Sequence, residues 1–388
     1  MANLFDYLDW RGDITFDMSP VNEVDCLLFS WLSYVNYEDI VPHDFSNGVT
    51  LKKASELFLE KYDLDRILSE SVSFTRTSGL ALKKAANTKR FASIKIKGFR
   101  NEIDYGNDSQ FAALTLQIDP KTTVVVFRGT DDTIVGWKED FNMCIMPEVP
   151  AQKKALEYLK EAAGKQRGSL YVCGHSKGGN LSIFSSVFAD KKIRDRIIKV
   201  YNFDGPGFGD SIVLGEDAKA MLKKTESYTP SESIVGMLLN HVEDYTVVRS
   251  TQRNIMQHDA GSWMIVGTHF VTADEVEYRS KAFDDTMKNW LRQMTVEERE
   301  TFIDALFKIL SANNAKTTTD IGADVIKSAA GMIKEYNGLS KDSRNMLKKF
   351  TGVFLKEGGE ALMKRRRSAL KPPVSEDEAN DTDTEDLG

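Results

Sequence analysis

Short apolar segments alternate with segments of helical periodicity between residues 110 and 275, and this alternation limits the possible folds more than any other feature. The apolar, β-branched runs are TTVVVFRG (122–129), SLYVCG (169–174), IIKVYNF (197–203) and DYTVVRS (244–250). Helical patterns at 151–163 and 178–194 separate the first three runs. Strands that are apolar throughout and alternate with helices are typical of βαβ units. We therefore expect an α/β fold with a mostly parallel central sheet.

A helical layer is expected on the N-terminal side of this region. Residues 21–41 and 51–62 place apolar side chains at helical spacing. We therefore expect residues 1–105 to form a mostly helical layer, packed on a core formed by residues 106–282.

The C-terminal part of the chain is predicted to be helical until an acidic tail begins. Residues 283–370 contain a capping box at 295–298, directly before the apolar run FIDALFKIL. Gly358-Gly359 is expected to weaken the end of the last helix. Residues 371–388 have too few apolar side chains to fold alone, so we expect a disordered tail.

The chain has 388 residues and a formal net charge of −7, and this charge comes from the tail. Residues 375–388 hold seven acids and no base, so the rest of the chain has as many acidic as basic side chains. This equal number of acidic and basic side chains outside the tail argues against nucleic-acid binding. The basic run at 364–367 suggests at most a transient contact with an anionic membrane surface.

The cysteines and the N-terminus point to a reducing compartment. Cys26, Cys144 and Cys173 are too few for a disulfide framework and lack the spacing of a zinc site. The first sixteen residues contain three acids and no long apolar run, unlike a signal peptide. No apolar stretch reaches the roughly 18 residues of a membrane-spanning helix. We therefore expect a cytoplasmic protein, and we expect no metal and no cofactor.

The segment GHSKGGN at 174–180 carries the pattern G-x-S-x-G, with Ser176 at its centre. It lies between a predicted strand and a predicted helix, which is the context that a nucleophile elbow requires. Gly174 and Gly178 have no side chains, so the backbone can pass closely on both sides of the serine. The N-terminus of the following helix favours the negative charge that develops beside a serine nucleophile.

A serine nucleophile needs a base, and histidine is the usual proton acceptor near neutral pH. Because the acid and the base follow the serine in chains with this elbow, the candidates are His241, His258 and His269. We favour His258, since QHDAGSW reads as a loop after the last of the four strands. His175 is adjacent to the nucleophile, and we expect it to order the elbow.

The acid and the oxyanion hole complete the predicted site. Asp204 ends a predicted strand, where its carboxylate would point into the ligand crevice, and we favour it over the alternative acid Glu232. An oxyanion hole needs two backbone N–H groups. One is expected from Lys177, directly after the serine. The other is expected from Thr130 in FRGTDD, with its hydroxyl as a third group and Asp131 as the neighbouring alternative.

The order FRGT, then GHSKGGN, then a loop histidine resembles the class 3 lipases. The resemblance covers roughly residues 110–270, less than half of the chain. It implies an α/β-hydrolase fold with helical N- and C-terminal extensions, and it implies acyl-ester hydrolysis. Ser176 would be the nucleophile, His258 the base and Thr130 part of the oxyanion hole.

Two positions depart from the pattern of these lipases. Lys177 stands where they have leucine, and Ser233 stands where their acid precedes a short apolar run. The segments NEVD, GWKEDFNM and NFDGPGF also look like an uncharacterised, mostly cytoplasmic group of bacterial lipase-like proteins, which has no settled substrate.

Two apolar runs, 134–146 and 234–239, are candidates for an acyl groove or a lid. Lys177 is a candidate contact for an anionic head group. We expect a serine hydrolase of lipid metabolism that cleaves a small-molecule or lipid-like carboxylic ester. The alternatives are a catalytically weak, hydrolase-like binding protein and an acyltransferase or thioesterase on the same scaffold.

Overall fold

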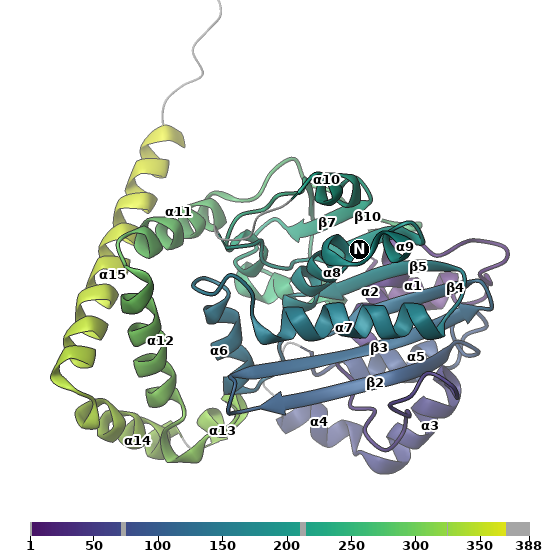
Figure 1. Ribbon diagram of the computed structural model, residues 1–388, viewed down its shortest axis with the longest axis horizontal. Coiled ribbons are helices and arrows are strands. Elements are labelled where there is room, and N and C mark those ends of the chain that lie inside the picture. Colours follow the sequence, from purple (N-terminus) through teal and green to yellow (C-terminus); the bar gives the residue numbers. More distant parts are fainter. Residues whose placement is uncertain (1, 71–74, 210–214, 324, 370–388) are drawn as a thin grey trace, which may run out of the picture.

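The computed structural model describes residues 2–70, 75–209, 215–323 and 325–369, and it is built around an eight-stranded sheet (Figure 1). The strands lie side by side in sequence order. They are β1 (Val49–Thr50), β2 (Lys95–Asp104), β3 (Ser109–Asp119), β4 (Thr122–Phe127), β5 (Ser169–His175), β6 (Ile197–Phe203), β7 (Thr225–Pro230) and β8 (Tyr245–Val248). A separate small ribbon pairs β9 (Ile265–Val266) with β10 (His269–Phe270).

Neighbouring strands are antiparallel from β1 to β4 and parallel from β4 to β8. Four of the seven pairings within the described sheet are thus parallel, and the predicted α/β fold with a mostly parallel sheet is confirmed. The helices of this part are α6 (Ile134–Asn142), α7 (Pro150–Lys165), α8 (Lys177–Phe188), α9 (Lys191–Arg194) and α10 (Glu216–Leu222).

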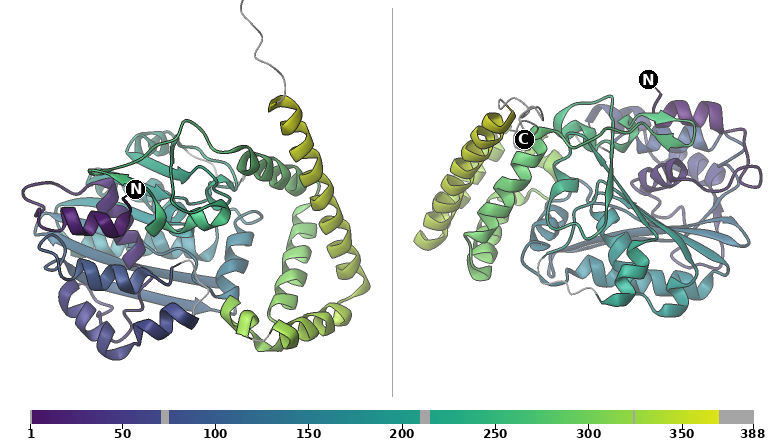
Figure 2. Two further views of the ribbon diagram at one scale, coloured as in Figure 1. Left: turned by 180° about the vertical axis from the view of Figure 1, so that it is seen from behind. Right: turned by 90° about the horizontal axis from the view of Figure 1, so that it is seen from above.

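The order of the parallel strands explains why helices of different origin cover the two faces of the sheet. Right-handed crossovers between strands in sequence order place their helices on one face. Accordingly α7, α8 and α10 share one apolar cluster with Val125 and Phe127 of β4. Val124 and Val126 point the other way and pack against the N-terminal helices. Figure 2 shows the sheet between these two helical layers.

The N-terminal helices cover the face that the crossover helices leave open. They are α1 (Leu4–Arg11), α2 (Glu23–Leu32), α3 (Leu51–Lys61), α4 (Leu64–Glu70) and α5 (Ser78–Ala85). Every residue of α2 except Glu23 is buried, as expected of a helix that is apolar on most sides. This helix lies against the parallel strands β4, β5 and β6.

The sheet begins earlier in the chain than the predicted boundary at residue 105. β1 and β2 lie within residues 1–105, and β2 pairs with β3. The sequence KIKGFRNEID does not show a clear strand pattern. Polar side chains interrupt the apolar ones, and the register of the pairing between β2 and β3 shifts between Lys97 and Arg100. Gly98, inside that shift, has a φ of +60°, a conformation that favours glycine.

The C-terminal helices stand beside the sheet, next to α6 (Figures 1 and 2). They are α11 (Tyr278–Arg292), α12 (Val296–Leu310), α13 (Thr318–Ala323), α14 (Val325–Gly338) and α15 (Lys341–Ala369). Thr295 and Glu298 form the predicted capping box. The helix α15 continues through Gly358-Gly359, because glycine costs a helix only about 1 kcal/mol relative to alanine. The predicted tail, 371–388, lies outside the described residues.

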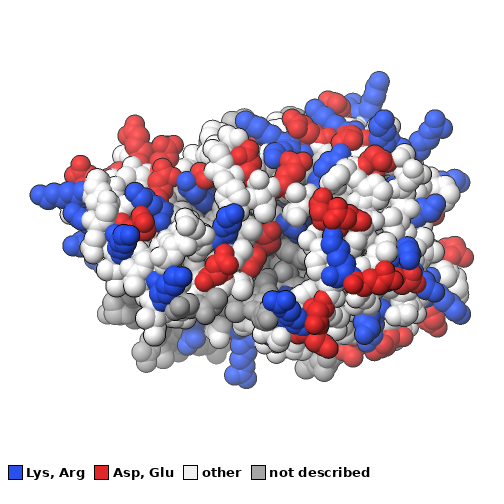
Figure 3. Space-filling view, turned by 90° about the horizontal axis from the view of Figure 1, so that it is seen from below, with Lys and Arg blue, Asp and Glu red and all other residues white. Residues whose placement is uncertain are grey.

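The charged side chains are of mixed sign on the face drawn in Figure 3. Lys and Arg alternate there with Asp and Glu over the described part of that face, and no broad area of one sign is visible on it. Within the described ranges, none of the helices combines the length and the apolar composition that a membrane crossing requires.

Candidate active site

The parallel strands bring the predicted site residues to one edge of the sheet. Because the carboxyl ends of parallel strands lie at the same edge, residues that follow different strands become neighbours. In chain order these are Thr130 after β4, Ser176 after β5, Asp204 after β6, Glu232 after β7 and His258 after β8. Ser176, His258, Thr130 and Lys177 line one cavity of about 170 Å³ at this edge.

The backbone at Ser176 has the conformation of a strained elbow. Ser176 has φ 58° and ψ −135°, and it occupies the N-cap position between β5 and α8. Its N–H donates to the carbonyl of Phe203 at 2.9 Å, which anchors the turn to β6. A Cβ on Gly174 would lie 2.2 Å from the carbonyl oxygen of Gly178, and one on Gly178 would lie 2.1 Å from that of Phe127. Both positions therefore require glycine.

Asp204 is the carboxylate that lies beside His258. The Oδ2 atom of Asp204 is 2.6 Å from Nδ1 of His258, and Asp204 is only 1% exposed. Its other oxygen, Oδ1, accepts a 2.5 Å hydrogen bond from the hydroxyl of Ser233. The Ser233 oxygen in turn accepts from the N–H of Gly236 at 2.9 Å. Both carboxylate oxygens are thus held, and one of them faces the histidine ring.

The alternative acid and the alternative bases lie elsewhere. Glu232 accepts a hydrogen bond from the side chain of Gln257 at 3.1 Å instead of contacting His258. His241 is 3.1 Å from Glu243, and His269 is 71% exposed on β10. Neither of these two histidines lines the cavity.

His175 packs on His258 and fixes its backbone. The two rings lie with centroids 4.5 Å apart, and Nε2 of His175 is 2.8 Å from the carbonyl oxygen of His258. A carbonyl only accepts, so Nε2 carries a proton, and burial holds the pKa of His175 well below its ordinary value. Nδ1 therefore accepts from the hydroxyl of Tyr34, at 2.9 Å. The sequence contains no signal for the contribution of Tyr34, which belongs to a distant N-terminal segment.

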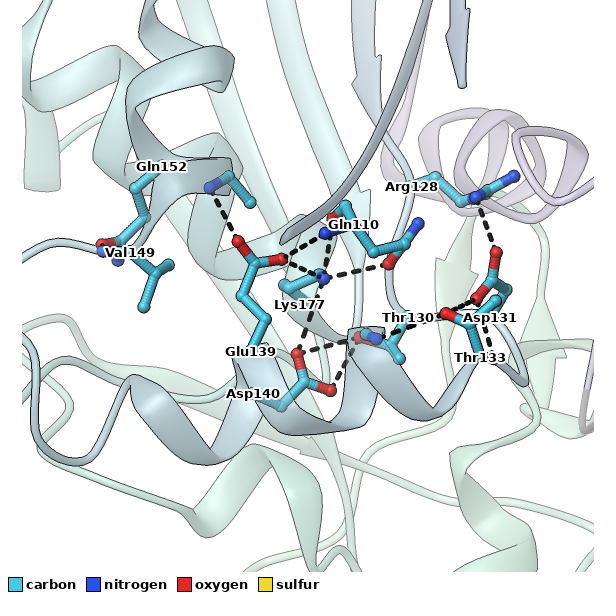
Figure 4. Close-up of polar contacts among 12 residues, drawn as sticks. Gln110, Arg128, Thr130, Asp131, Thr133, Glu139, Asp140, Val149, Gln152 and Lys177 are labelled. Atoms are coloured by element: carbon cyan, nitrogen blue, oxygen red, sulfur yellow. Dashed lines mark hydrogen bonds and ion pairs between the residues drawn. The ribbon is translucent and has the colours of Figure 1, made fainter. Parts of the chain in front are cut away.

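Lys177 points into the protein, and the expectation that it contacts an anionic head group is wrong. Its side chain is 1% exposed, and Nζ lies 2.9 Å from Oε2 of Glu139, which is also fully buried (Figure 4). The ammonium also donates to the carbonyl and side-chain oxygens of Gln110, at 2.9 Å each. A buried charge needs such partners, and α6 supplies the carboxylate. Only the backbone N–H of Lys177 remains as a candidate oxyanion donor.

The oxyanion loop is held by two carboxylates. The hydroxyl of Thr130 donates to Asp140, with 2.7 Å to Oδ2, so its proton is not directed at an oxyanion (Figure 4). Burial raises the pKa of Asp140 to about 6. Asp131 accepts from the N–H of Thr133 at 3.0 Å and from Arg128 at 2.9 Å. Asp131 therefore shapes the loop through its carboxylate, and the backbone N–H groups of Thr130 and of the neighbouring Asp131 stay the candidates for the second oxyanion contact.

The two apolar runs predicted as groove or lid divide between core and cavity. In the first run, Ile134 and Val135 are buried, whereas Trp137 and Phe141 of α6 line the cavity. In the second run, the cavity is lined by Val235, Leu238 and Leu239. The cavity thus has a polar end, formed by the residues around Ser176, and apolar walls beyond it.

A parallel sheet with a strained elbow serine after β5, and with an acid and a histidine after later strands, defines an α/β-hydrolase fold. The family model Mbeg1-like matches residues 85–308, more than half of the chain. The chain therefore belongs to the Mbeg1-like family, which is lipase-like.

Solved lipase structures show a weak likeness to this chain. The M37 lipase is 17% identical with a TM-score of 0.35, over 55% of this chain and 69% of that one. The native propeptide complex of Rhizomucor miehei lipase is 16% identical with a TM-score of 0.31, over 52% and 70% of the two chains. Likenesses of this size carry no weight for activity. No curated protein matches the chain.

Proposed function

We propose that this protein is a serine hydrolase that cleaves a carboxylic ester with an apolar acyl group. One observation supports this proposal above the others. The elbow residue Ser176 lines the same cavity as His258, whose Nδ1 is 2.6 Å from the buried carboxylate of Asp204. A nucleophile, a base and an acid that orients the base are the groups that acyl-enzyme chemistry needs.

The residues have separate roles in this proposal. Nε2 of His258 takes the proton of Ser176 as the serine oxygen attacks the ester carbonyl, and Asp204 stabilises the charged ring. The N–H groups of Thr130 and Lys177 bind the oxyanion. The alcohol then leaves with the proton from His258, and a water molecule that gives its proton to His258 releases the acid from the serine. This is the division of roles that the resemblance to class 3 lipases implies.

The setting of this activity is part of the proposal. Cys26, Cys144 and Cys173 are free thiols, and we place the protein in a reducing cytoplasm on that ground. The alternative of a binding protein without turnover rested on the uncertain acid and on the long helical extensions at both ends. The contact between Asp204 and His258 weakens the first of these two grounds. An acyltransferase or thioesterase uses the same residues and differs in the acceptor or the leaving group.

Covalent labelling with an alkyl fluorophosphonate tests the proposal. We expect one adduct by intact mass on the wild type and none on Ser176→Ala, since only an activated serine reacts. Turnover of a graded ester panel should disappear in the same variant. An unlabelled wild type that is folded and monodisperse would overturn the proposal. Product that forms only when a second alcohol or amine is added would instead indicate an acyltransferase, and faster turnover of acyl thioesters would indicate a thioesterase.

A further inference from the structure

The cavity at Ser176 continues away from the catalytic residues, towards the C-terminal helices. Phe141 and Cys144, on and after α6, line it together with Met287 of α11. The same three residues also line a second, smaller void of about 10 Å³. That void is bordered by Trp290 and Met294, which are buried among the C-terminal helices. The two spaces thus share Phe141, Cys144 and Met287 as lining residues.

We propose that the crevice between α6 and α11 holds the acyl chain of the substrate, and that Met287 sets the chain length the site accepts. This inference rests on the proposed function. It assigns the C-terminal helices a role in substrate selection, as one wall of the acyl site.

The strand order indicates that this side of the site takes the acyl group and not the alcohol. Thr130 and α6 follow β4, on one side of β5, whereas Asp204 and His258 follow β6 and β8, on the other side. The leaving alcohol must lie next to His258, because it takes its proton from that ring. The acyl chain stays attached to Ser176 and extends in the other direction, towards α6, whose Phe141 lines the cavity together with Met287 of α11.

The chemistry of the crevice fits a flexible apolar chain. Met287 is half-buried, and methionine side chains adapt to irregular apolar shapes. Burial raises the pKa of the Cys144 thiol to about 12, so this side chain stays uncharged near neutral pH. The walls shared by the two spaces therefore carry no charge.

The far end of the crevice is held in place by polar contacts. The guanidinium of Arg299 donates to the carbonyl of Cys144 at 3.2 Å and to that of Leu291 at 2.6 Å, so it joins the ends of α6 and α11. Trp290 donates from Nε1 to the carbonyl of Phe350 at 2.8 Å. A site that selects chain length needs an end that does not move, and these contacts fix the far end of the crevice. Met287 is the adaptable side chain of its wall.

Substitutions of Met287 test the proposal in the full-length protein. Met287→Trp should lower kcat/KM for dodecanoyl esters by about tenfold or more relative to acetyl esters, since one misfitted methylene already costs about that factor. Met287→Ala should shift the preference towards longer acyl chains. Met221→Ala is the matched control, because Met221 is buried at 3% exposure in α10 and does not line the cavity.

The alcohol is varied in a second series at constant acyl chain. We expect the Met287 variants to respond to acyl length and to be indifferent to alcohol length. An effect confined to alcohol length would assign the crevice to the leaving group and overturn the proposal. An acyl-length profile unchanged in both variants would overturn it as well.

Labelling by a short-chain fluorophosphonate separates this proposal from the proposed function. If the wild type is not labelled, the hydrolase proposal itself fails. If Ser176 is labelled equally in the wild type and both Met287 variants, and the profile for chain length is unchanged, only the acyl-site proposal fails. Circular dichroism establishes whether each variant is folded. If Met287→Trp does not fold, the smaller change Met287→Ala still decides the test.

Discussion

Replacing Lys177 by methionine is expected to destabilise the protein by about 3–5 kcal/mol. The change leaves the carboxylate of Glu139 buried without its counter-charge, and removing one partner of a buried pair has a cost of about this size. Glu139 would still accept hydrogen bonds from the N–H groups of Gln110 and Ala151, at 3.0 and 2.9 Å. These neutral donors do not replace an ammonium group. The backbone N–H of residue 177 is kept, so a folded variant should still react with the serine probe.

The chain offers a control ion pair with a similar N–O distance and different burial. Lys191 and Asp195 are 2.8 Å apart, much like Lys177 and Glu139 at 2.9 Å, but their side chains are 78% and 61% exposed. Lys191→Met should therefore cost no more than about 0.5 kcal/mol. Urea unfolding followed by circular dichroism compares the midpoints, provided that the denaturant slope does not change.

A double-mutant cycle shows whether the pair itself causes the loss. Lys177→Met and Glu139→Gln together should cost less than the sum of the two single changes, by about 0.5–3 kcal/mol for residues in one network. A loss for Lys177→Met as small as that for Lys191→Met would refute the reasoning, because the ammonium group would then be in water. Strict additivity in the cycle would refute it too.

The remaining predictions concern the acid and the oxyanion loop. Asp204→Asn should reduce kcat by about three to four orders of magnitude, whereas Glu232→Gln should leave turnover of the same ester near wild type; equal, small losses would mean that neither residue is the acid. The folded protein holds the proton of Asp140 more tightly than the unfolded chain does, because its pKa is raised from 3.8 to about 6. The contribution of this group to the free energy of unfolding therefore falls as the pH rises between these two values. Asp140→Asn should remove that fall, which urea midpoints measured across this pH range would show. Parallel profiles of midpoint against pH for the variant and the wild type would contradict this reasoning.

The parts of the site that depend on local pattern could be predicted from the sequence. The elbow at Ser176 follows from G-x-S-x-G between a strand and a helix, because the pattern lies within one turn of consecutive residues. Gly174 is required by the carbonyl of Gly178 in that turn, and Gly178 by the carbonyl of Phe127 on β4. The capping box at Thr295 and Glu298 is local in the same sense. The alternation of apolar runs and helices predicted the parallel part of the sheet.

Local pattern favoured Asp204 but left Glu232 open. Asp204 directly follows β6 and Glu232 comes shortly after β7, so both lie at the same edge of the sheet, where either carboxylate could reach a histidine. The structure places Asp204 2.6 Å from His258 and turns Glu232 towards Gln257. Ser233 stands where the class 3 lipases, which this chain resembles, have their acid. Its hydroxyl donates a hydrogen bond to Asp204.

Burial reversed the expectation for Lys177, and sheet pairing revealed β2. Lysine side chains are usually exposed, but the carboxylate of Glu139, supplied by α6, makes the burial of Lys177 at the start of α8 tolerable. The strand β2 has a mixed pattern and a bulge, so only its pairing with β3 identifies it. The sequence by itself determined the periodicity of each segment and the place of the elbow serine, because both depend on residues close along the chain. The tertiary structure decided which distant side chains meet, because that depends on the strand order and on the side of the sheet to which each connection returns.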